Sequence, residues 1–202
     1  MTAMPKKFVL ASGNAGKIRE ITHLLDGLGA TVVAQSELGV EEVAETGTSF
    51  TENALIKALH ASAVTGLPAI ADDSGLVVDA LDGAPGIYSA RYAGPHATDD
   101  GNIDKLLKEL KESKSTSRGA AFHCVATFVS PDDTRPLFAE GVWRGSILQS
   151  RRGEGGFGYD PIFLDAESGC SAAELSSAQK NVCSHRGQAL RELIALLEER
   201  FS

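Results

Sequence analysis

The stretch 8-FVLASGNAGKIREITHLLDGLGATVVAQ-35 contains the signals for the first three elements of the fold. Its first four residues are apolar, as in a short buried strand, and a Ser-Gly-Asn loop follows them. Apolar side chains then recur at helical spacing, which predicts a helix over 17–29 that ends at Gly27 or Gly29. A second strand is expected at 30–35. This strand–loop–helix–strand order predicts an α/β fold.

The rest of the chain continues the alternation of strands and helices. Ser49 and Glu52 have capping-box spacing and predict the start of a helix over 52–66. The turn residues 131–136 indicate a hairpin between the strands on either side. Apolar periodicity predicts further helices over 98–113 and 185–200, and further strands at 68–71, 75–81, 120–130, 136–147 and 162–164.

Two adjacent aspartates, Asp72 and Asp73, follow the apolar strand at 68–71, and Ser-Gly follows them. Like charges repel, and removing either carboxylate from water is costly without a partner. We therefore expect the strand to end there, with the charge absorbed either by a hard cation or by a solvated turn.

The composition is that of a globular protein, which we treat as one domain over 1–202. Of its 202 residues, 43% are hydrophobic and 23% are charged, and the formal net charge is −8. An acidic chain is poorly suited to binding the phosphate backbone of a nucleic acid, although a few lysines in one cleft are enough to bind a small anion. No apolar run approaches the length of a membrane span.

The cysteines Cys124, Cys170 and Cys183 are odd in number, and their spacing matches no zinc pattern. We expect three thiols in a reducing compartment. The first residues have an apolar stretch too short for a signal peptide, so a cytoplasmic location is expected.

A glycine-rich loop separates the first strand from the first helix. Backbone N–H groups at a helix start can face an anion, and Lys17 adds positive charge. The loop is not a Walker motif, because only two residues separate its glycines and Ile18 follows the lysine. Phosphate binding and a plain turn with a solvated lysine both remain open. The candidate phosphate-binding residues are Ser12, Gly13, Asn14, Ala15, Gly16 and Lys17.

The stretch 153-GEGGFG-158 fits the GxGxxG pattern, but its context is wrong for a dinucleotide site. Pro161 follows closely and no helix opens after it. The alternative is a flexible loop that offers Phe157 and Tyr159 as stacking faces for a planar base, with Asp160 as a polar contact. Burial of both rings in the core is the simpler interpretation.

Acidic and basic residues on other loops complete the candidate site. Glu45 and Asp73 are carboxylates of the kind that hold Mg²⁺ together with water and substrate oxygens. Lys57 lies four residues after Asn53 and projects from the same side of a helix, although such lysines are most often on the surface. Three positive residues precede or begin the last predicted helix. The helix dipole does not stabilise positive side chains at a helix start, so their presence there favours a role in ligand binding. These residues are Lys180, His185 and Arg186.

Five blocks of the chain together resemble one family. They are 10-LASGNAGKIREI-21, 45-ETGTSFTENALIKA-58, 70-IADDSGLVVDALDGAPGIYSARYAG-94, 155-GGFGYDPIF-163 and 184-SHRGQAL-190. In this order and spacing the chain resembles the inosine triphosphate pyrophosphatases, which act on non-canonical purine nucleoside triphosphates. The resemblance covers nearly the whole chain and is far more specific than any single block.

The resemblance implies a fold and a reaction. The family fold is an elongated, two-lobed α/β structure with a long twisted mixed β-sheet flanked by helices, an active-site cleft between the lobes, and a homodimeric assembly. The family reaction is the Mg²⁺-dependent hydrolysis of dITP, ITP or XTP to the monophosphate and pyrophosphate. It cleanses the nucleotide pool of deaminated purines.

The resemblance also implies roles for single residues. Asp73 would be the proton acceptor and, with Glu45, would bind the metal. The loop from Ser12 to Lys17 would hold the phosphates, and Lys57 and Ser74 would contact substrate. The nucleobase end would be formed by Phe157, Gly158, Tyr159, Asp160, Lys180, His185 and Arg186. The donors His185 and Arg186 suit a 6-oxo purine better than adenine, which presents an amino donor at that position.

Two other functions remain open from the residues alone. A nucleotide-binding regulatory module would keep the glycine loop and the aromatic loop, but it would not need Glu45 and Asp73 together. A phosphotransferase would need an acceptor site and would release a nucleoside diphosphate. Metal-dependent turnover and product analysis separate these alternatives from a pyrophosphatase.

Overall fold

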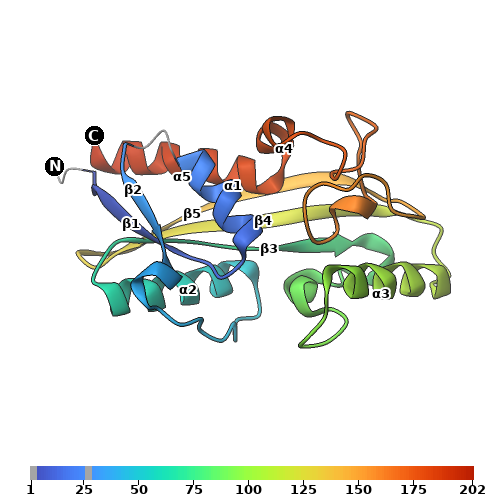
Figure 1. The fold of residues 1–202 in the computed structure, drawn as a ribbon, viewed down its shortest axis with the longest axis horizontal. Helices are drawn as coiled ribbons and strands as arrows, with labels where there is room; N and C mark the ends of the chain where they lie inside the picture. Colours follow the sequence, from blue (N-terminus) through green and yellow to red (C-terminus); the bar gives the residue numbers. More distant parts are fainter. Residues whose placement is uncertain (1–3, 26–28) are drawn as a thin grey trace. The chain divides into compact units, whose positions relative to one another are not determined.

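A computed structural model describes residues 4–25 and 29–202 of the chain. In these residues the strands form a six-stranded sheet in the order β2-β1-β3-β4-β5-β6, with helices on both of its faces (Figure 1). In chain order, the elements are β1 (Lys7–Ala11), α1 (Ala15–Leu25), β2 (Thr31–Ala34), η2 (Gln35–Leu38), α2 (Phe50–Thr65), β3 (Ala69–Val78), η3 (Asp79–Leu81), η4 (Gly86–Arg91), α3 (Asp99–Glu112), β4 (Gly119–Ser130), β5 (Asp133–Ile147), η5 (Asp160–Ile162), β6 (Phe163–Asp165), α4 (Ser177–Cys183) and α5 (His185–Phe201).

The sheet is mixed. β1 pairs in parallel with β2 and with β3, whereas β5 and β6 are antiparallel. β4 and β5 are neighbours in the sheet and only two residues separate them, as the predicted hairpin requires. The predicted α/β class is therefore confirmed, together with the mixed sheet and its flanking helices.

The chain divides into two compact units. Unit 1 consists of Met1–Asp73, Cys124–Gly141 and Arg186–Ser202, and unit 2 consists of Ser74–His123 and Val142–His185. β3, β4 and β5 each contribute residues to both units.

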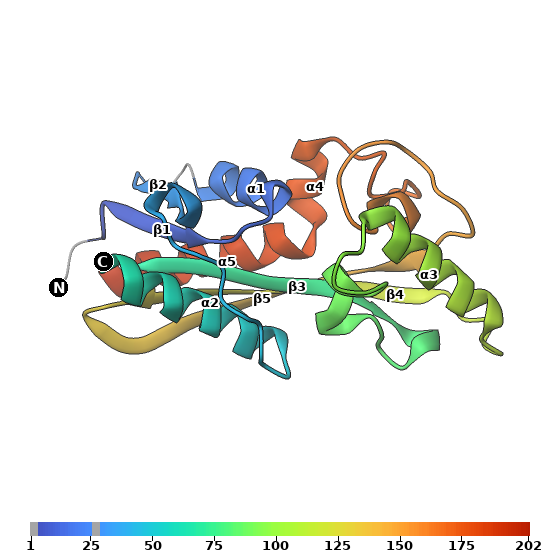
Figure 2. The same ribbon diagram turned by 60° about the horizontal axis from the view of Figure 1, so that its bottom comes forward.

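Unit 1 has an apolar layer on each face of its strands. Phe8, Leu10 and Ile70 belong to the layer that includes residues of α1 and α5, whereas Val9 and Ala71 belong to the layer that includes residues of α2. Figure 1 and Figure 2 show α1 and α5 on one side of these strands and α2 on the other. Successive residues of a strand point to opposite faces, so both faces of β1 and β3 are buried in this unit.

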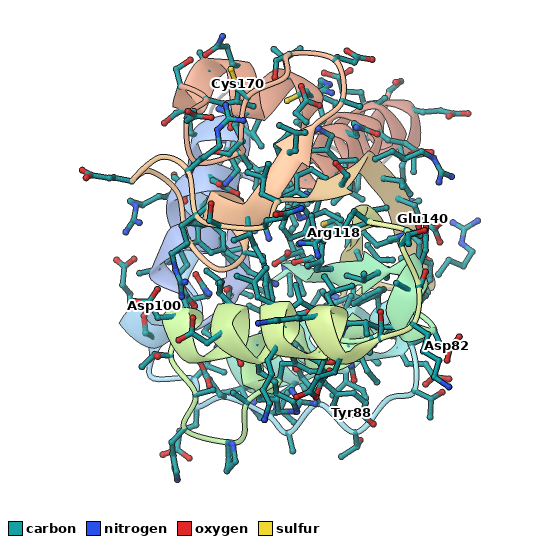
Figure 3. All side chains as sticks on the ribbon, turned by 90° about the vertical axis from the view of Figure 1, so that its right-hand side faces the viewer. Asp82, Tyr88, Asp100, Arg118, Glu140 and Cys170 are labelled. Atoms are coloured by element: carbon teal, nitrogen blue, oxygen red, sulfur yellow. The ribbon has the colours of Figure 1, made fainter. Side chains whose placement is uncertain are left out.

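Unit 2 has one apolar cluster, built around Phe122, Trp143 and Phe163 with residues of α3. In Figure 3, α3 lies across the front of this unit, and Asp100 is labelled at its N-terminal end. Arg118, also labelled, donates from Nε to the carbonyl of Ile147 at 2.8 Å and so joins the ends of β4 and β5.

The helix and strand predictions are largely confirmed. Ser49 is the N-cap of α2 and accepts from the N–H of Glu52 at 3.2 Å. The first predicted helix is α1, although part of its expected end, Gly27 and Leu28, lies outside the described residues. The helix α4 was not predicted, although Ser176 and Gln179 form a capping box at its start.

The prediction that a strand ends at Asp72-Asp73 is wrong. β3 continues without interruption from Ala69 to Val78, with both aspartates in the strand and both buried. The predicted strands at 68–71 and 75–81 are therefore one strand. A turn is unnecessary because, as the site shows, each carboxylate meets its own cation.

The three cysteines are free thiols in the described structure, and Cys124 is buried. Over residues 4–25 and 29–202, no helix has the length and apolar character needed to cross a membrane.

Candidate active site

The parallel pairing of β1 with β3 brings the glycine loop after β1 next to the two aspartates of β3. Ala11 is paired with Ala71, so the chain leaves β1 at Ser12 beside Asp72. Ligands of parallel α/β sheets bind beyond the carboxyl ends of the strands, where such loops meet.

The glycine loop is shaped by its own side chains. Asn14 Oδ1 accepts from the N–H groups of Gly16 at 2.9 Å and Lys17 at 3.1 Å, and so caps α1. Ser12 Oγ accepts from the N–H of Asn14 at 3.3 Å. Gly13 lies against the carboxylate of Glu42, where a Cβ atom would collide with it. The loop is thus a fixed turn, with Ser12 and Lys17 at its two ends.

Asp72 points to the face of the sheet that α1 and α5 cover. Its Oδ2 lies 3.1 Å from Lys17 Nζ and 3.2 Å from Arg186 Nε. Arg186 also pairs with Glu20, and the thiol of Cys124 lies 3.8 Å from the same Asp72 oxygen. Burial alone would raise the pKa of Asp72, but Lys17 and Arg186 hold it well below its ordinary range. We call these five residues the α1-face cluster.

Asp73 points to the opposite face, which α2 covers. Lys57 Nζ lies 3.3 Å from Asp73 Oδ1 and 2.7 Å from Glu45 Oε1. Burial raises the pKa of Asp73, and Lys57 and Lys17 offset this only in part, so the pKa stays above its ordinary value. Burial lowers the pKa of Lys57, but Asp73, Asp72 and Glu45 more than compensate. We call Asp73, Lys57 and Glu45 the α2-face cluster.

The two clusters explain the adjacent aspartates. Alternation along β3 sends Asp72 and Asp73 to opposite faces, where different helices supply the positive charge. In the described structure the positive charge that meets these carboxylates comes from side chains of the protein itself, and the expected hard cation stays a prediction.

A tight loop before α2 positions Glu45. The N–H of Gly47 donates to Asn53 Oδ1 at 2.8 Å, and the N–H of Thr48 donates to Glu52 Oε2 at 2.6 Å. Asn53 is fully buried, and its Nδ2 has no hydrogen-bond partner in the described part of the chain. The loop backbone is therefore fastened to the first turn of α2 just after Glu45.

Replacing Gly47 with alanine should loosen this loop. A Cβ atom at Gly47 would lie 2.6 Å from Glu52 Cβ and 2.7 Å from Asn53 Oδ1, so one of them must move. Overpacking of this kind costs about 1–3 kcal/mol. Urea unfolding of Gly47→Ala should show that loss, whereas Gly39→Ser, in open space at positive φ, serves as the backbone-strain control. A midpoint equal to that of the wild type would show that the loop adapts.

The α2-face cluster fits a hard divalent cation. Asp73 Oδ2 is buried and has no hydrogen-bond partner among the described residues. The carboxylate of Glu45 contacts Lys57 Nζ, the ammonium that also pairs with Asp73 Oδ1. In residues 4–25 and 29–202, no group of three or more His, Cys, Asp or Glu side chains could hold a metal. Mg²⁺ commonly takes only one or two carboxylates and completes its shell with water and phosphate oxygens, so this donor set suits it.

Unit 2 contains a separate group of predicted residues around Phe157. Buried Asp160 accepts from the N–H of Phe157 at 2.9 Å and from Lys180 Nζ at 2.5 Å. Lys180 Nζ also lies 4.9 Å from the centre of the Phe157 ring. Asp160 and Lys180 therefore fix the backbone and the ring of Phe157 at once.

Tyr159 and His185 are buried in the same unit. The Tyr159 hydroxyl donates to the carbonyl of Ser89 at 2.9 Å, and burial raises its pKa. The His185 ring stacks on Phe122, with centroids 4.8 Å apart and an interplanar angle of 10°. Phe157, which is only partly buried, is thus the better placed of the two predicted stacking rings.

The predicted residues fall into two groups by unit. Unit 1 holds the glycine loop, Glu45, Lys57, Asp73 and Arg186, whereas unit 2 holds Ser74, His185 and the Phe157 group. Arg186, predicted at the nucleobase end, has its guanidinium on Asp72 and Glu20. Sequence reasoning missed Glu20, Cys124 and the structural role of Asp72, because only the fold brings these residues together.

Comparison with known proteins finds relatives that match nearly the whole chain. A family model described as the Ham1 family matches residues 8–196. The dITP/XTP pyrophosphatase of Methylococcus capsulatus is 58% identical over 195 residues, which are 96% of this chain and 97% of that protein. The dITP/XTP pyrophosphatase of Vibrio cholerae is 55% identical, with 96% and 98% covered.

Solved structures agree in fold. A HAM1 protein from Coxiella burnetii is 48% identical, with a TM-score of 0.88 over 96% of this chain and 98% of that chain. The Ham1 protein of Staphylococcus aureus is 42% identical, with a TM-score of 0.86 over 96% of this chain and all of that chain.

Proposed function

The chain belongs to the Ham1 family, and on this premise we propose that it hydrolyses non-canonical purine nucleoside triphosphates, namely dITP, ITP and XTP. The products are the nucleoside monophosphate and pyrophosphate. The observation that carries the proposal is the α2-face cluster, in which a buried, unpartnered carboxylate oxygen lies beside a lysine and a second carboxylate.

The chain's own residues account for the main steps. Lys17 and Lys57 neutralise charge on the phosphates, and Ser12 and Asn14 hold their oxygens at the start of α1. A water molecule attacks the α-phosphorus, and the bond from this atom to the oxygen that bridges to the β-phosphorus breaks. Pyrophosphate leaves with the electron pair. Asp73 accepts the proton of the water, and its raised pKa brings it closer to the working pH of a general base.

Glu45 and Asp73 would hold Mg²⁺, which would supply further neutralisation of the phosphate charge. Unit 2 supplies the nucleobase end, where the partly buried ring of Phe157 stacks on the base and Lys180 and Asp160 hold that ring in place. Tyr159 supports the loop from inside the core. Ser74, Gly158, His185 and Arg186 remain predicted substrate contacts.

Two finer parts of the proposal come from the family resemblance. We propose that the protein is a homodimer and that it works in the cytoplasm on deaminated purine nucleotides. The free thiols are compatible with a reducing compartment. Sedimentation velocity tests the dimer directly.

Removal of divalent metal should abolish turnover. We expect ITP with Mg²⁺ to give IMP and pyrophosphate, EDTA to stop the reaction, and excess Mg²⁺ to restore it, because the triphosphate and the carboxylates of Glu45 and Asp73 repel one another without a divalent cation. Anion-exchange chromatography separates the products. ATP and GTP run beside ITP as specificity controls.

Each alternative has its own outcome in this assay. Release of IDP and orthophosphate would mean cleavage of the other bond and would contradict the proposal. ITP binding without turnover would identify a nucleotide sensor, and full activity in EDTA would remove the metal from the mechanism.

A further inference from the structure

The loop that leads to Phe157 is fastened to the first turns of α3. Arg151 donates from its guanidinium to Asp104 Oδ1 at 2.7 Å and to Asp100 Oδ1 at 3.2 Å. The backbone N–H of Gly158 donates to Asp99 Oδ2 at 2.6 Å. These contacts join residues more than 40 positions apart in the chain, and all of them lie within unit 2. We call them the α3 clasp.

The other side of the same loop is held by the segment before α4. The N–H of Gly155 donates to the Ala173 carbonyl at 3.1 Å, and Ser171 Oγ donates to the carbonyl of Arg152 at 2.7 Å. A Cβ atom at Gly155 would lie 2.7 Å from the Ala173 carbonyl oxygen, so glycine is required for this close approach. The loop is therefore pinned from two directions.

Phe157 lies between two glycines in this pinned loop. Gly156 and Gly158 have φ values of +76° and +59°, a region that glycine adopts at little cost and other residues rarely adopt. Asp160 holds the Phe157 N–H, but the N–H of Gly158, the next residue, is held by Asp99. The orientation of the ring thus depends on α3 as well as on Asp160.

We propose that Arg151 and Asp99 are positioning residues for nucleobase recognition, which act by holding the Phe157 loop in its binding conformation. This inference rests on the proposed function, because it takes Phe157 as the ring on which the base stacks. Loosening the clasp lowers the affinity for the nucleotide without touching the carboxylates and lysines of unit 1. The predicted signature is a higher KM at nearly unchanged kcat, which marks a loss of uniform binding.

The size of the effect follows from the type of contact. Asp99 holds the N–H of the residue next to Phe157, whereas Arg151 lies six positions before Phe157 in exposed ion pairs, so Asp99→Ala should raise KM for ITP about fivefold and Arg151→Gln about threefold. Asp99→Asn keeps an acceptor for the Gly158 N–H and should restore most of the loss. Lys108→Gln is the matched control, because it removes an exposed ion pair with Glu112 on the same helix.

The test combines steady-state kinetics on ITP with hydrogen exchange of the full-length protein, followed on peptides that cover 151–160. Faster exchange there in Asp99→Ala and Arg151→Gln, with a raised KM and an unchanged kcat, would support the proposal. Exchange in the rest of the chain reports whether the variants fold.

Unchanged exchange in the loop, or a fall in kcat at constant KM, would overturn the role of the clasp. Equal effects in Lys108→Gln would overturn it too, because they would show a general effect of charge on α3. Absence of ITP hydrolysis by the wild-type protein would overturn the proposed function itself, and the wild-type assay separates that case from failure of the clasp alone.

Discussion

Replacing Asp73 with asparagine should lower kcat for ITP by about 10³-fold while the protein stays folded. The change keeps the shape of the side chain but removes the charge that would bind Mg²⁺ and accept the proton. Lys57 keeps Glu45 at 2.7 Å, and burial raises the pKa of Asp73, so a neutral side chain at this position costs little stability. We therefore expect an unfolding midpoint close to that of the wild type.

Kinetics and urea unfolding on the same preparation test this prediction. Asp82→Asn is the matched control, because Asp82 is an exposed carboxylate outside the candidate site, and its φ of +51° is one that an asparagine tolerates. In Figure 3, Asp82 is labelled on the turn after β3. Activity within tenfold of the wild type in Asp73→Asn would remove both proposed roles from this carboxylate.

Replacing Asp72, its neighbour, should instead reduce stability. Asp72→Asn leaves Arg186, only 2% exposed, and Lys17 without their shared carboxylate. Breaking a buried ion pair by removing one partner costs about 3–5 kcal/mol. We expect the urea midpoint to fall accordingly. Arg135→Gln is the control, because it removes an ion pair whose arginine side chain is 79% exposed, and it should leave the midpoint nearly unchanged.

The pH dependence checks the cause of this loss. A carboxylate whose pKa is lowered by folding stabilises the protein above its ordinary pKa of about 4, and the benefit disappears as the pH falls towards the lowered value. The stability difference between wild type and Asp72→Asn should therefore be largest near neutral pH and shrink below pH ~4. A difference independent of pH would point to lost packing in place of lost charge.

Local patterns were enough to predict most of the fold. Apolar periodicity located β1 and α1, and the Ser49–Glu52 spacing located the start of α2, because these signals depend on residues a few positions apart. The error at β3 has a different origin. Whether a strand can continue through Asp72 and Asp73 depends on cations from other elements, and these are invisible in a local window.

The parts of the site that could be predicted depend on sequence blocks, whereas the unpredicted parts depend on contacts between residues far apart in the chain. The α2-face cluster unites Glu45, Lys57 and Asp73, which all belong to blocks that the resemblance had singled out. Arg186 and Asp72 are 114 positions apart, and only sheet register and helix packing bring them together. The roles of the individual residues in catalysis stay predictions until the variants are measured.

The passage of β3, β4 and β5 through both units has a consequence for dissecting the gene. The chain crosses between units at 73/74, 123/124, 141/142 and 185/186, and two of these junctions separate predicted site residues, Asp73 from Ser74 and His185 from Arg186. No single cut of the coding sequence releases either unit whole. A premature stop codon anywhere before residue 186 removes the last segment of unit 1, so truncation alleles should behave as complete losses rather than as partial enzymes.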